Sequence, residues 1–485
     1  MVQDINQVFP NPFKGIQVNY CVSTGCENFG RSDVSLYQLV PNNKALNIYF
    51  CPKCGAYPQI INNRAVYETI EHQKRYHALS LTACPKIECE SHQRAVHIHP
   101  EDYRSFGKTN SQKQRYQCRS CSTVFTDQLS YVNTHSETQN AMFYGMVYSF
   151  GVRNICQKLG ITAKTFYKHQ RAMVERLKYI AHVKEDAFFR QTEEVHLATG
   201  YQFIGKNQGT MLVATAHNPS GYIVAFDSNI ITQMSEECLL ETSTIQTLNH
   251  YVDMKETDID LLADITAQYE RIMARSNYLD PTSDGRTVQH SHKGEVMQPY
   301  LTCFSHALML RKRMNHKSRR YYFVQQDTLL RNAYLNASLE ELVSGEDHLF
   351  YYRESAREMT WFDREALNIR QVGWWQDKWG FISNQGKTKG ACHIKGPHLP
   401  RETWQSLLEQ NSLESVEHYL ASASDFFRSL GTTLNEQSIN DWLHIYTGYY
   451  NFCWPHRNGK TPAQLLGLFE RPMTLGELLN GYECY

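Results

Sequence analysis

Three runs of mostly apolar residues stand near the middle of the chain, and turn residues separate them. The runs are EEVHLATGYQFIG (193–205), GTMLVATAHN (209–218) and GYIVAFDSNI (221–230). Their length and their β-branched and aromatic residues predict three strands of an antiparallel meander. Apolar residues then recur with helical spacing over 258–278 and 303–314, and RRYYFVQQD (319–327) predicts another strand that ends in a carboxylate. This order of elements predicts an α/β domain.

A helical pattern precedes these strands, over residues 136–183, with Ser136 as the expected N-cap. Within it, VRNICQKLGITAKTFYKHQ (152–170) predicts a short helix, a turn at Gly160 and a second helix capped by Thr162. In a helix-turn-helix of this kind the outward face of the second helix reaches base edges and phosphates. The residues expected on that face are Lys164, Thr165, Tyr167, Lys168 and Arg171. An ordinary helical hairpin with a solvated polar face is the alternative.

Eight of the 14 cysteines form an internal repeat. The pairs in YCVSTGCENF and ACPKIECESH are spaced C-x4-C, and those in FCPKCGAY and QCRSCSTV are spaced C-x2-C. The order is wide, narrow, wide, narrow, and two such pairs together supply the four thiolates of a structural zinc site. The sequence therefore predicts two zinc ribbons, with the ligands Cys21, Cys26, Cys51 and Cys54 in the first and Cys84, Cys89, Cys118 and Cys121 in the second.

Disulfides are the alternative use of these cysteines. Residues 1–13 show no secretion signal, and the remaining six cysteines are scattered singly, so both observations disfavour disulfides. His92 is an alternative ligand to Cys89. Four thiolates leave no open coordination position, so the expected role of both zinc ions is to stabilise the fold.

Composition and charge add two constraints. At 485 residues the chain is too long for one hydrophobic core, and its apolar fraction of 41% is that of a folded protein. No run of apolar residues is long enough to span a bilayer, and we expect the protein to be cytoplasmic. The net charge is zero, yet residues 1–184 carry 22 Lys or Arg and 12 Asp or Glu, against 27 and 37 in the rest. A basic amino-terminal part beside an acidic remainder favours a nucleic-acid partner for the first of them.

The residues described so far, together with three longer stretches, resemble the transposases of bacterial insertion sequences. The stretches are ATGYQFIGKNQGTMLVATAHNPSGYIVAFDSNI (198–230), YYFVQQDTLLRNA (321–333) and YYNFCWPHRNGKTPAQLLGL (449–468). The last of these is similar to the YN…H…TP tail of integrase-type enzymes. The resemblance implies a ribonuclease-H-like core, double-stranded DNA as partner, and a DDE site in which two Asp and one Glu hold two Mg²⁺ or Mn²⁺ ions for DNA cleavage and strand transfer.

The acids that this resemblance implies are only partly present. Gly200 stands where the first Asp is expected, and a glycine cannot ligate a metal; Glu193, Glu194 and Asp227 are the nearby carboxylates. Asp327 matches the second acid. The alternative is that Gln325 occupies the place that the family gives to this Asp, with Asp327 as its neighbour, and Asp327 also suits a helix N-cap. For the third acid the expectation is Glu436, with Asp425 and Glu417 as alternatives.

The sequence thus predicts a multidomain protein of two β zinc ribbons (1–80 and 81–135), a helix-turn-helix segment (136–185) and an α/β ribonuclease-H-like core (186–345 and 411–485) with a helical insertion (346–410). Two functions stay open: an active DDE transposase that uses Asp327 and Glu436, and a transposase-derived DNA-binding or regulatory protein whose catalytic core is degenerate. Whether the chain forms a homo-oligomer is also left open.

Overall fold

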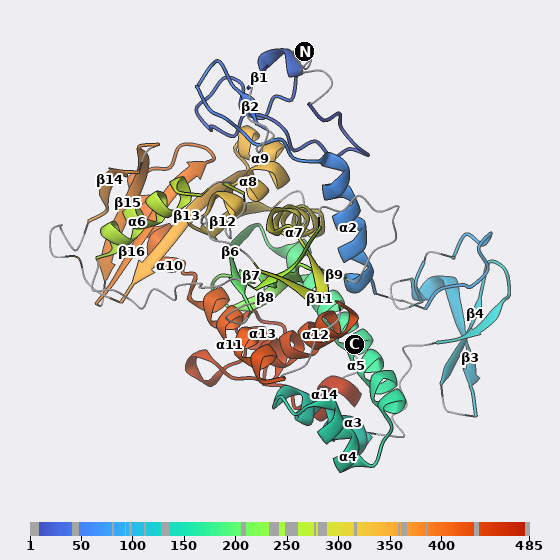
Figure 1. Ribbon diagram of the computed structural model, residues 1–485. Coiled ribbons are helices and arrows are strands. Elements are labelled where there is room, and N and C mark those ends of the chain that lie inside the picture. Colours follow the sequence, from blue (N-terminus) through green and yellow to red (C-terminus); the bar gives the residue numbers. More distant parts are fainter. Residues whose placement is uncertain are drawn as a thin grey trace. The chain divides into compact units, whose positions relative to one another are not determined.

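The protein divides into two compact units, seen here in a computed structural model (Figure 1). The first unit comprises Met1–Tyr76, Phe188–Arg428 and Thr433–Asn440, and the second comprises His77–Ala187, Ser429–Thr432 and Asp441–Tyr485. The structure describes residues 9–40, 48–79, 82–92, 94–96, 99–110, 113–127, 136–204, 210–231, 242–247, 260–275, 278–279, 289–314, 318–356, 359, 366–373, 375–384, 386–430 and 436–480.

An eight-stranded mixed sheet forms the centre of the first unit, in the order β14-β15-β16-β13-β12-β6-β7-β8. As the pattern predicted, β6 (Glu194–Phe203), β7 (Met211–His217) and β8 (Tyr222–Ser228) form an antiparallel meander. Strand β12 (Arg319–Gln325) runs parallel to β6, and β13 (Asp347–Ser355) runs parallel to β12. The two central parallel strands are buried on both faces, which explains why their sequences are nearly continuous apolar runs.

The expected helical insertion over residues 346–410 is wrong. This segment forms β13 and then β14 (Asn368–Val372), β15 (Asp377–Asn384) and β16 (Lys387–Lys395), which extend the sheet, and only α10 (Arg401–Gln410) is a regular helix. Helix α10 packs against β15 and β16, and Trp379 is fully buried with its indole N–H donating to the Tyr269 hydroxyl at 3.0 Å. The segment forms strands because β16 pairs with β13 and β15 pairs with β16, so that each strand extends the ladder of the existing sheet.

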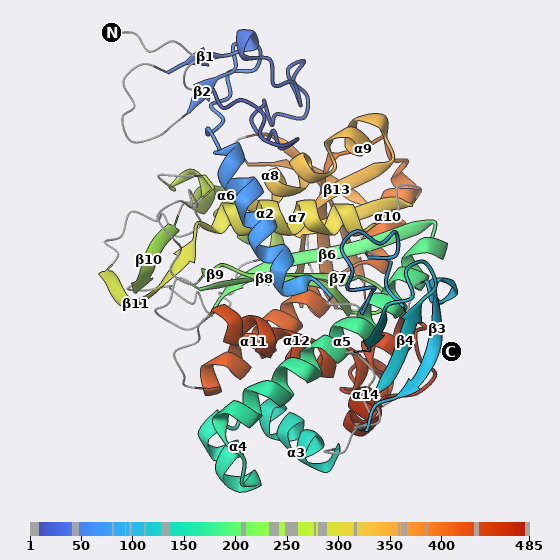
Figure 2. The same cartoon turned by 90° about the vertical axis from the view of Figure 1, so that its right-hand side faces the viewer.

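Helices cover both faces of the sheet. Helices α7 (Pro299–Arg313) and α8 (Thr328–Ala337) pack together on one face (Figure 2), where Thr199 of β6 is hydrogen-bonded to Tyr334 of α8 at 2.6 Å. The next residue of β6, Gly200, points to the opposite face and lies against Leu420 of α11 (Glu414–Leu430). Side chains alternate between faces along a strand, so Gly200 belongs to the face that α11 covers.

Smaller elements complete the first unit. Helix α6 (Leu261–Met273) and helix α9 (Leu339–Ser344) flank the sheet, and β9 (Ile230–Ile231), β10 (Thr242–Thr247) and β11 (Gln289–Met297) form a separate three-stranded sheet that the sequence pattern did not predict. The amino-terminal part contributes β1 (Gln38–Leu39), β2 (Tyr49–Phe50) and α2 (Asn63–His77).

The second unit contains a three-stranded sheet and the helical segment. Its sheet is β3 (Tyr103–Lys108), β4 (Gln114–Cys118) and β5 (Val124–Thr126), and its helices include α3 (Ser136–Val147), α4 (Val152–Leu159) and the long α5 (Ala163–Gln191). The carboxyl-terminal chain joins it through α12 (Glu436–Phe452), α13 (Pro462–Leu465) and α14 (Leu475–Asn480). Gly448 of α12 lies so close to Leu177 of α5 that a β-carbon would stand 2.7 Å from its side chain, so the glycine permits this helix contact. In the described part of the chain, no helix combines the length and the apolar character needed to cross a bilayer.

Candidate metal centres and the ends of strands β6 and β12

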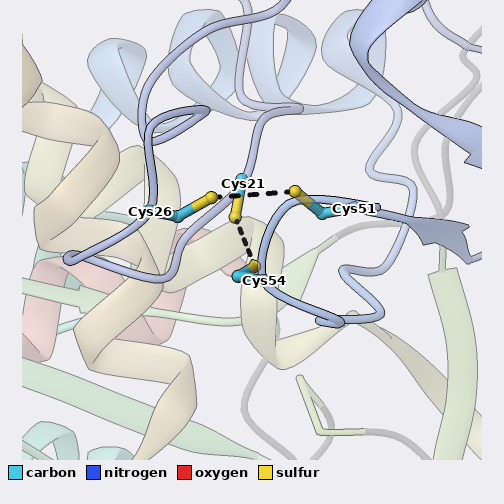
Figure 3. A group of neighbouring side chains, drawn as sticks. All are labelled: Cys21, Cys26, Cys51 and Cys54. Carbon is cyan, nitrogen blue, oxygen red and sulfur yellow. Dashed lines mark hydrogen bonds between the residues drawn. The ribbon is translucent and has the colours of Figure 1, made fainter.

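The first cysteine set converges on one point, as the spacing predicted. Figure 3 shows the four sulfur atoms turned toward a common centre, with Sγ atoms 3.5 Å apart between Cys21 and Cys54 and 3.8 Å apart between Cys26 and Cys51. Four thiolates around zinc at about 2.3 Å stand about 3.8 Å from one another, whereas bonded sulfurs stand about 2.05 Å apart. The arrangement therefore fits a tetrahedral zinc ion and contains no disulfide among these four residues.

The second set repeats this geometry. The Sγ atoms are 3.4 Å apart between Cys84 and Cys121 and 3.6 Å apart between Cys89 and Cys118. His92, the alternative ligand, instead donates from Nδ1 to the Cys84 carbonyl at 2.7 Å. The second set is thus a four-cysteine group, and His92 supports the loop that carries its first ligand.

A tyrosine in each ribbon holds the wide pair in place, and sequence reasoning missed both. The Tyr37 hydroxyl accepts from the amide of Cys21 at 2.8 Å and donates to the Arg31 carbonyl at 2.5 Å. In the second ribbon the Tyr103 hydroxyl accepts from the amide of Cys84 at 3.2 Å and donates to the Arg94 carbonyl. Each of these carbonyls lies five residues after the second cysteine of its wide pair, so an alignment of the two repeats would have exposed the two tyrosines.

The narrow pairs lie in tight turns that present amide groups to sulfur. The residue after each narrow pair has a left-handed backbone, Gly55 with φ 75° and Ser122 with φ 60°. Hydrogen bonds from the side chain and the amide of Thr123 lower the pKa of Cys121 to about 6. Burial raises the pKa of Cys51, but donors that include the Asn28 amide outweigh it and lower the value to about 7. Each set therefore contains at least one thiol whose pKa is lowered towards the deprotonated form that metal binding requires.

The expected helix-turn-helix segment has the chain geometry that its sequence suggested. Helix α4 ends at Gly160, which has φ 63°, and the Thr162 hydroxyl accepts from the amide of Thr165 at 3.2 Å at the start of α5. The side chains of four expected contact residues are exposed and Thr165 is half-buried: Lys164, Thr165, Tyr167, Lys168 and Arg171. Phe166, between them, is fully buried and turns toward the unit's interior.

Two segments of the second unit contain basic residues and no acidic ones. From Tyr103 to Thr126 and from Thr138 to Val174 the sequence has ten Lys or Arg and no Asp or Glu. Nine of the ten basic side chains are exposed and Arg115 is half-buried. Such a distribution produces a positive potential over the β3–β4 hairpin and over the start of α5.

Asp327 lies at the end of β12, where a catalytic acid was expected, but its two oxygens are already engaged. Its side chain is 2% exposed and forms a two-pronged ion pair with Arg275, at 3.1 Å to Nη1 and 2.5 Å to Nη2. The same carboxylate accepts from the Leu329 amide at 2.9 Å, as N-cap of α8, and from the Tyr201 hydroxyl at 3.0 Å. Burial lowers the pKa of Arg275, and Asp327 outweighs this and raises it above the usual value. The guanidinium therefore supplies the positive charge that this buried carboxylate needs.

The neighbouring position on β6 carries no acid. A β-carbon on Gly200 would stand 3.4 Å from Gln325 Oε1 and 3.4 Å from Leu420 Cδ1, so these three residues of β6, β12 and α11 meet at one point. The Gln325 side chain accepts from the Tyr201 amide at 3.1 Å and ties the two strands together. A glycine, an amide and a leucine do not form a ligand set for Mg²⁺ or Mn²⁺.

The remaining candidate acids lie apart from this point. Asp227 is buried on β8 and accepts from His306 Nδ1 at 2.6 Å, and Glu193 and Glu194 are exposed at the start of β6. Glu417 and Asp425 have exposed side chains on α11, and Glu436 begins α12 with its side chain outside the described residues. In the described part of the chain, the two four-cysteine sets are the groups of His, Cys, Asp or Glu close enough to hold a metal ion.

The basic run RKRMNHKSRR at 311–320 is not one continuous surface. Arg311 and Arg320 are buried and pair with Glu341 and Asp347, the second pair at 2.8 Å, whereas Lys312, Arg313 and Arg319 are exposed. The two buried arginines tie helix α7 and strand β12 to their neighbours.

Searches of protein-family models, curated proteins and solved structures found no match to this chain.

Proposed function

We propose that the protein is a zinc-containing protein that binds double-stranded DNA through its second unit, and that its central sheet is a ribonuclease-H-like core of the transposase type without cleavage activity. The observation that carries the proposal is the charge distribution: ten basic and no acidic residues over Tyr103–Thr126 and Thr138–Val174, with nine of the ten basic side chains exposed. Exposed basic side chains on a helix-turn-helix beside a zinc ribbon are the electrostatic footprint of a DNA-binding module.

The strand order supports the proposed core. Strands β8, β7 and β6 are an antiparallel meander, β12 and β13 add to β6 in parallel, and a helix precedes each of the two parallel strands. This is the topology expected of a ribonuclease-H-like domain, with β6 and the end of β12 as the places where its acids would stand. The same topology could serve another α/β protein, so function depends on the site.

The site favours binding without cleavage. A two-metal mechanism needs carboxylate oxygens that are free to coordinate both ions. Gly200, Gln325 and Leu420 occupy the meeting point of the three elements, and Asp327 is neutralised by Arg275. We therefore place the protein among transposase-derived DNA-binding proteins, which is the second of the two functions that the sequence left open.

The first test of this function is the salt dependence of DNA binding. Binding of the zinc-loaded full chain to a fluorescent 30-base-pair duplex is measured by anisotropy over a range of KCl concentrations. Lys168→Ala with Arg171→Ala should weaken binding and reduce the slope of log K against log salt by about 1.8, because each lost phosphate contact removes about 0.9. Lys387→Ala, an exposed lysine of the first unit, is the matched control and should change neither quantity. Unchanged binding in the double variant would exclude α5 as the DNA-binding helix.

The second test concerns cleavage. Supercoiled plasmid incubated with the protein and Mg²⁺ or Mn²⁺ should stay intact. Nicking that disappears in Asp327→Asn would instead establish an active DDE enzyme and overturn the second half of the proposal, whatever the result for binding.

A further inference from the structure

The second unit exposes an unusual number of aromatic side chains beside its basic residues. Tyr144, Tyr148, Phe150 and Tyr167 are 49%, 62%, 44% and 42% exposed. All four lie within the acid-free stretch Thr138–Val174. Large aromatic side chains are normally among the buried residues of a domain, so a group of exposed ones beside positive charge calls for a ligand.

Two of these rings form an ordered pair. The rings of Tyr144 and Tyr148, at the end of α3, are parallel within 4° and their centroids are 6.3 Å apart. Neither side chain forms a hydrogen bond or an ion pair within the described residues. Their hydroxyls and the outer faces of their rings are thus available to a ligand.

The carboxyl-terminal tail extends the pair. Tyr449 at the end of α12 is half-buried and within electrostatic range of both tyrosines: burial raises its pKa, and Tyr148 and Tyr144 contribute to the rise. Tyr449 in turn stacks on Trp454 with centroids 5.9 Å apart. We define the aromatic surface as the exposed pair Tyr144 and Tyr148 together with Tyr449 and Trp454, two half-buried rings of the stretch that resembled the tail of integrase-type enzymes.

Basic side chains of the neighbouring helix α4 lie at the same end of α3 as this surface. Lys158 of α4 lies 4.7 Å from the ring centroid of Phe150, and Arg153 of the same helix is exposed. Gly145 of α3 packs against Ile155 of α4, which fixes the end of α3 beside these cations. Rings that accept stacking, next to cations that attract phosphates, are the combination found where proteins bind unpaired bases.

We propose that this aromatic surface stacks unpaired nucleobases, so that the second unit binds DNA in which a duplex adjoins a single-stranded segment. The inference rests on the proposed DNA binding and deepens it by naming the form of DNA. Stacking is tolerant of sequence because every base has a π-face, so the preference is for unpaired bases of any kind. The basic residues of α5 hold the duplex, and the aromatic surface holds the bases beyond its end.

The test compares three DNAs by anisotropy with the zinc-loaded full chain: a blunt duplex, the same duplex with a single-stranded tail of four bases, and the same duplex with a tail of four abasic sites. The abasic tail has the phosphates of the natural one and lacks only the rings. The natural tail should increase affinity over the abasic tail by about 5- to 150-fold for each stacked base. Equal affinity for the two tails would overturn the inference and leave duplex binding intact, whereas no binding to any of the three would overturn the proposed function.

Variants assign the preference to particular rings. Tyr144→Ala with Tyr148→Ala should remove the preference for the natural tail, Tyr148→Phe should keep it, and Tyr57→Ala, a 52% exposed tyrosine of the first unit, should leave it unchanged. Unaltered circular dichroism and zinc content verify that each variant is folded. If the double variant keeps the preference, these rings do not stack on the bases and the inference fails. If the double variant instead changes the sedimentation mass, the surface contacts protein and not bases, and the inference fails as well.

Discussion

The ion pair between Arg275 and Asp327 can be tested by removing its cation. Arg275→Met keeps much of the aliphatic length of the side chain and leaves the Asp327 carboxylate, 2% exposed, with the Leu329 amide and the Tyr201 hydroxyl as its remaining hydrogen-bond donors in the described structure. Breaking a buried pair in this way costs about 3–5 kcal/mol, because the remaining charge stays buried without compensation. Arg275→Met with Asp327→Asn removes both charges, and we expect it to recover most of that loss.

The measurement has to be local because the chain has two units and need not unfold in one step. Hydrogen exchange of peptides that cover β12 and α8 reports opening at this point. In Arg275→Met these amides should exchange faster by about two to four orders of magnitude, since each 1.4 kcal/mol is a factor of ten. Peptides of the second zinc ribbon should be unchanged and serve as the internal control.

Two results would refute the reasoning. Exchange in Arg275→Met at the parent rate would mean that the guanidinium does not stabilise Asp327. Protection of the β12 and α8 amides when Mn²⁺ is added to the parent, lost in Asp327→Asn, would mean that this carboxylate is free to bind a metal and that the site is catalytic after all.

Three further predictions concern the ribbons and the histidines. The chain should hold two zinc ions by elemental analysis; Cys54→Ser and Cys121→Ser should each lose one, and DNA binding should fall only in Cys121→Ser. Ser122 and Gly55 both have positive φ, which favours glycine. Ser122→Gly should therefore stabilise the second ribbon by about 1 kcal/mol, and Gly55→Ala should destabilise the first ribbon by a similar amount. Competition with a chelator should show tighter zinc binding in Ser122→Gly and weaker zinc binding in Gly55→Ala. Burial lowers the pKa of three histidines of the first unit, His217, His348 and His393, to about 4, 3 and 4. Below about pH 6.5 the unfolded chain therefore binds protons at these histidines that the folded chain does not bind. The free energy of unfolding in urea should fall by up to about 1.4 kcal/mol per histidine per pH unit as the pH drops from 6.5 towards 4, and the urea midpoint should fall with it. A midpoint that is flat over this range would contradict the last prediction.

Local patterns account for what the sequence predicted well. The spacing of the cysteines is local within each pair, so it identified both four-cysteine sets, and glycine and threonine signals located the turn between α4 and α5. The meander of β6, β7 and β8 followed from apolar runs and turn residues. In each case the decisive residues lie within a few positions of one another.

Contacts between distant residues account for the rest. Arg275 lies 52 positions before Asp327, and no spacing rule connects them. Tyr37 and Tyr103 support their zinc ligands from 16 and 19 positions away. The segment 346–410 was expected to be a helical insertion, whereas its strands gain their hydrogen bonds from an existing sheet edge.

The two ribbons show that a repeated local structure need not keep one role. The first ribbon lies in the unit of the central sheet, where Arg331 of α8 donates to the Val22 carbonyl at 2.9 Å and Lys395 of β16 donates to the Thr24 carbonyl at 3.2 Å. Gly30, with φ 73°, lies so close to Leu339 that a β-carbon would stand 2.8 Å from it, so this loop is fitted to the helices of the core.

The second ribbon lies in the unit of α3–α5, and its hairpin has five basic residues and no acid between Tyr103 and Thr126. A loop whose backbone carbonyls are bound by the side chains of the core cannot present them to a partner, whereas an exposed basic hairpin attracts phosphates over a distance set by screening. We therefore expect zinc in the first ribbon to stabilise the sheet's own fold, and we propose that zinc in the second ribbon shapes the basic hairpin for DNA. The chain thus uses one scaffold twice, and the residues around each copy determine what it contacts.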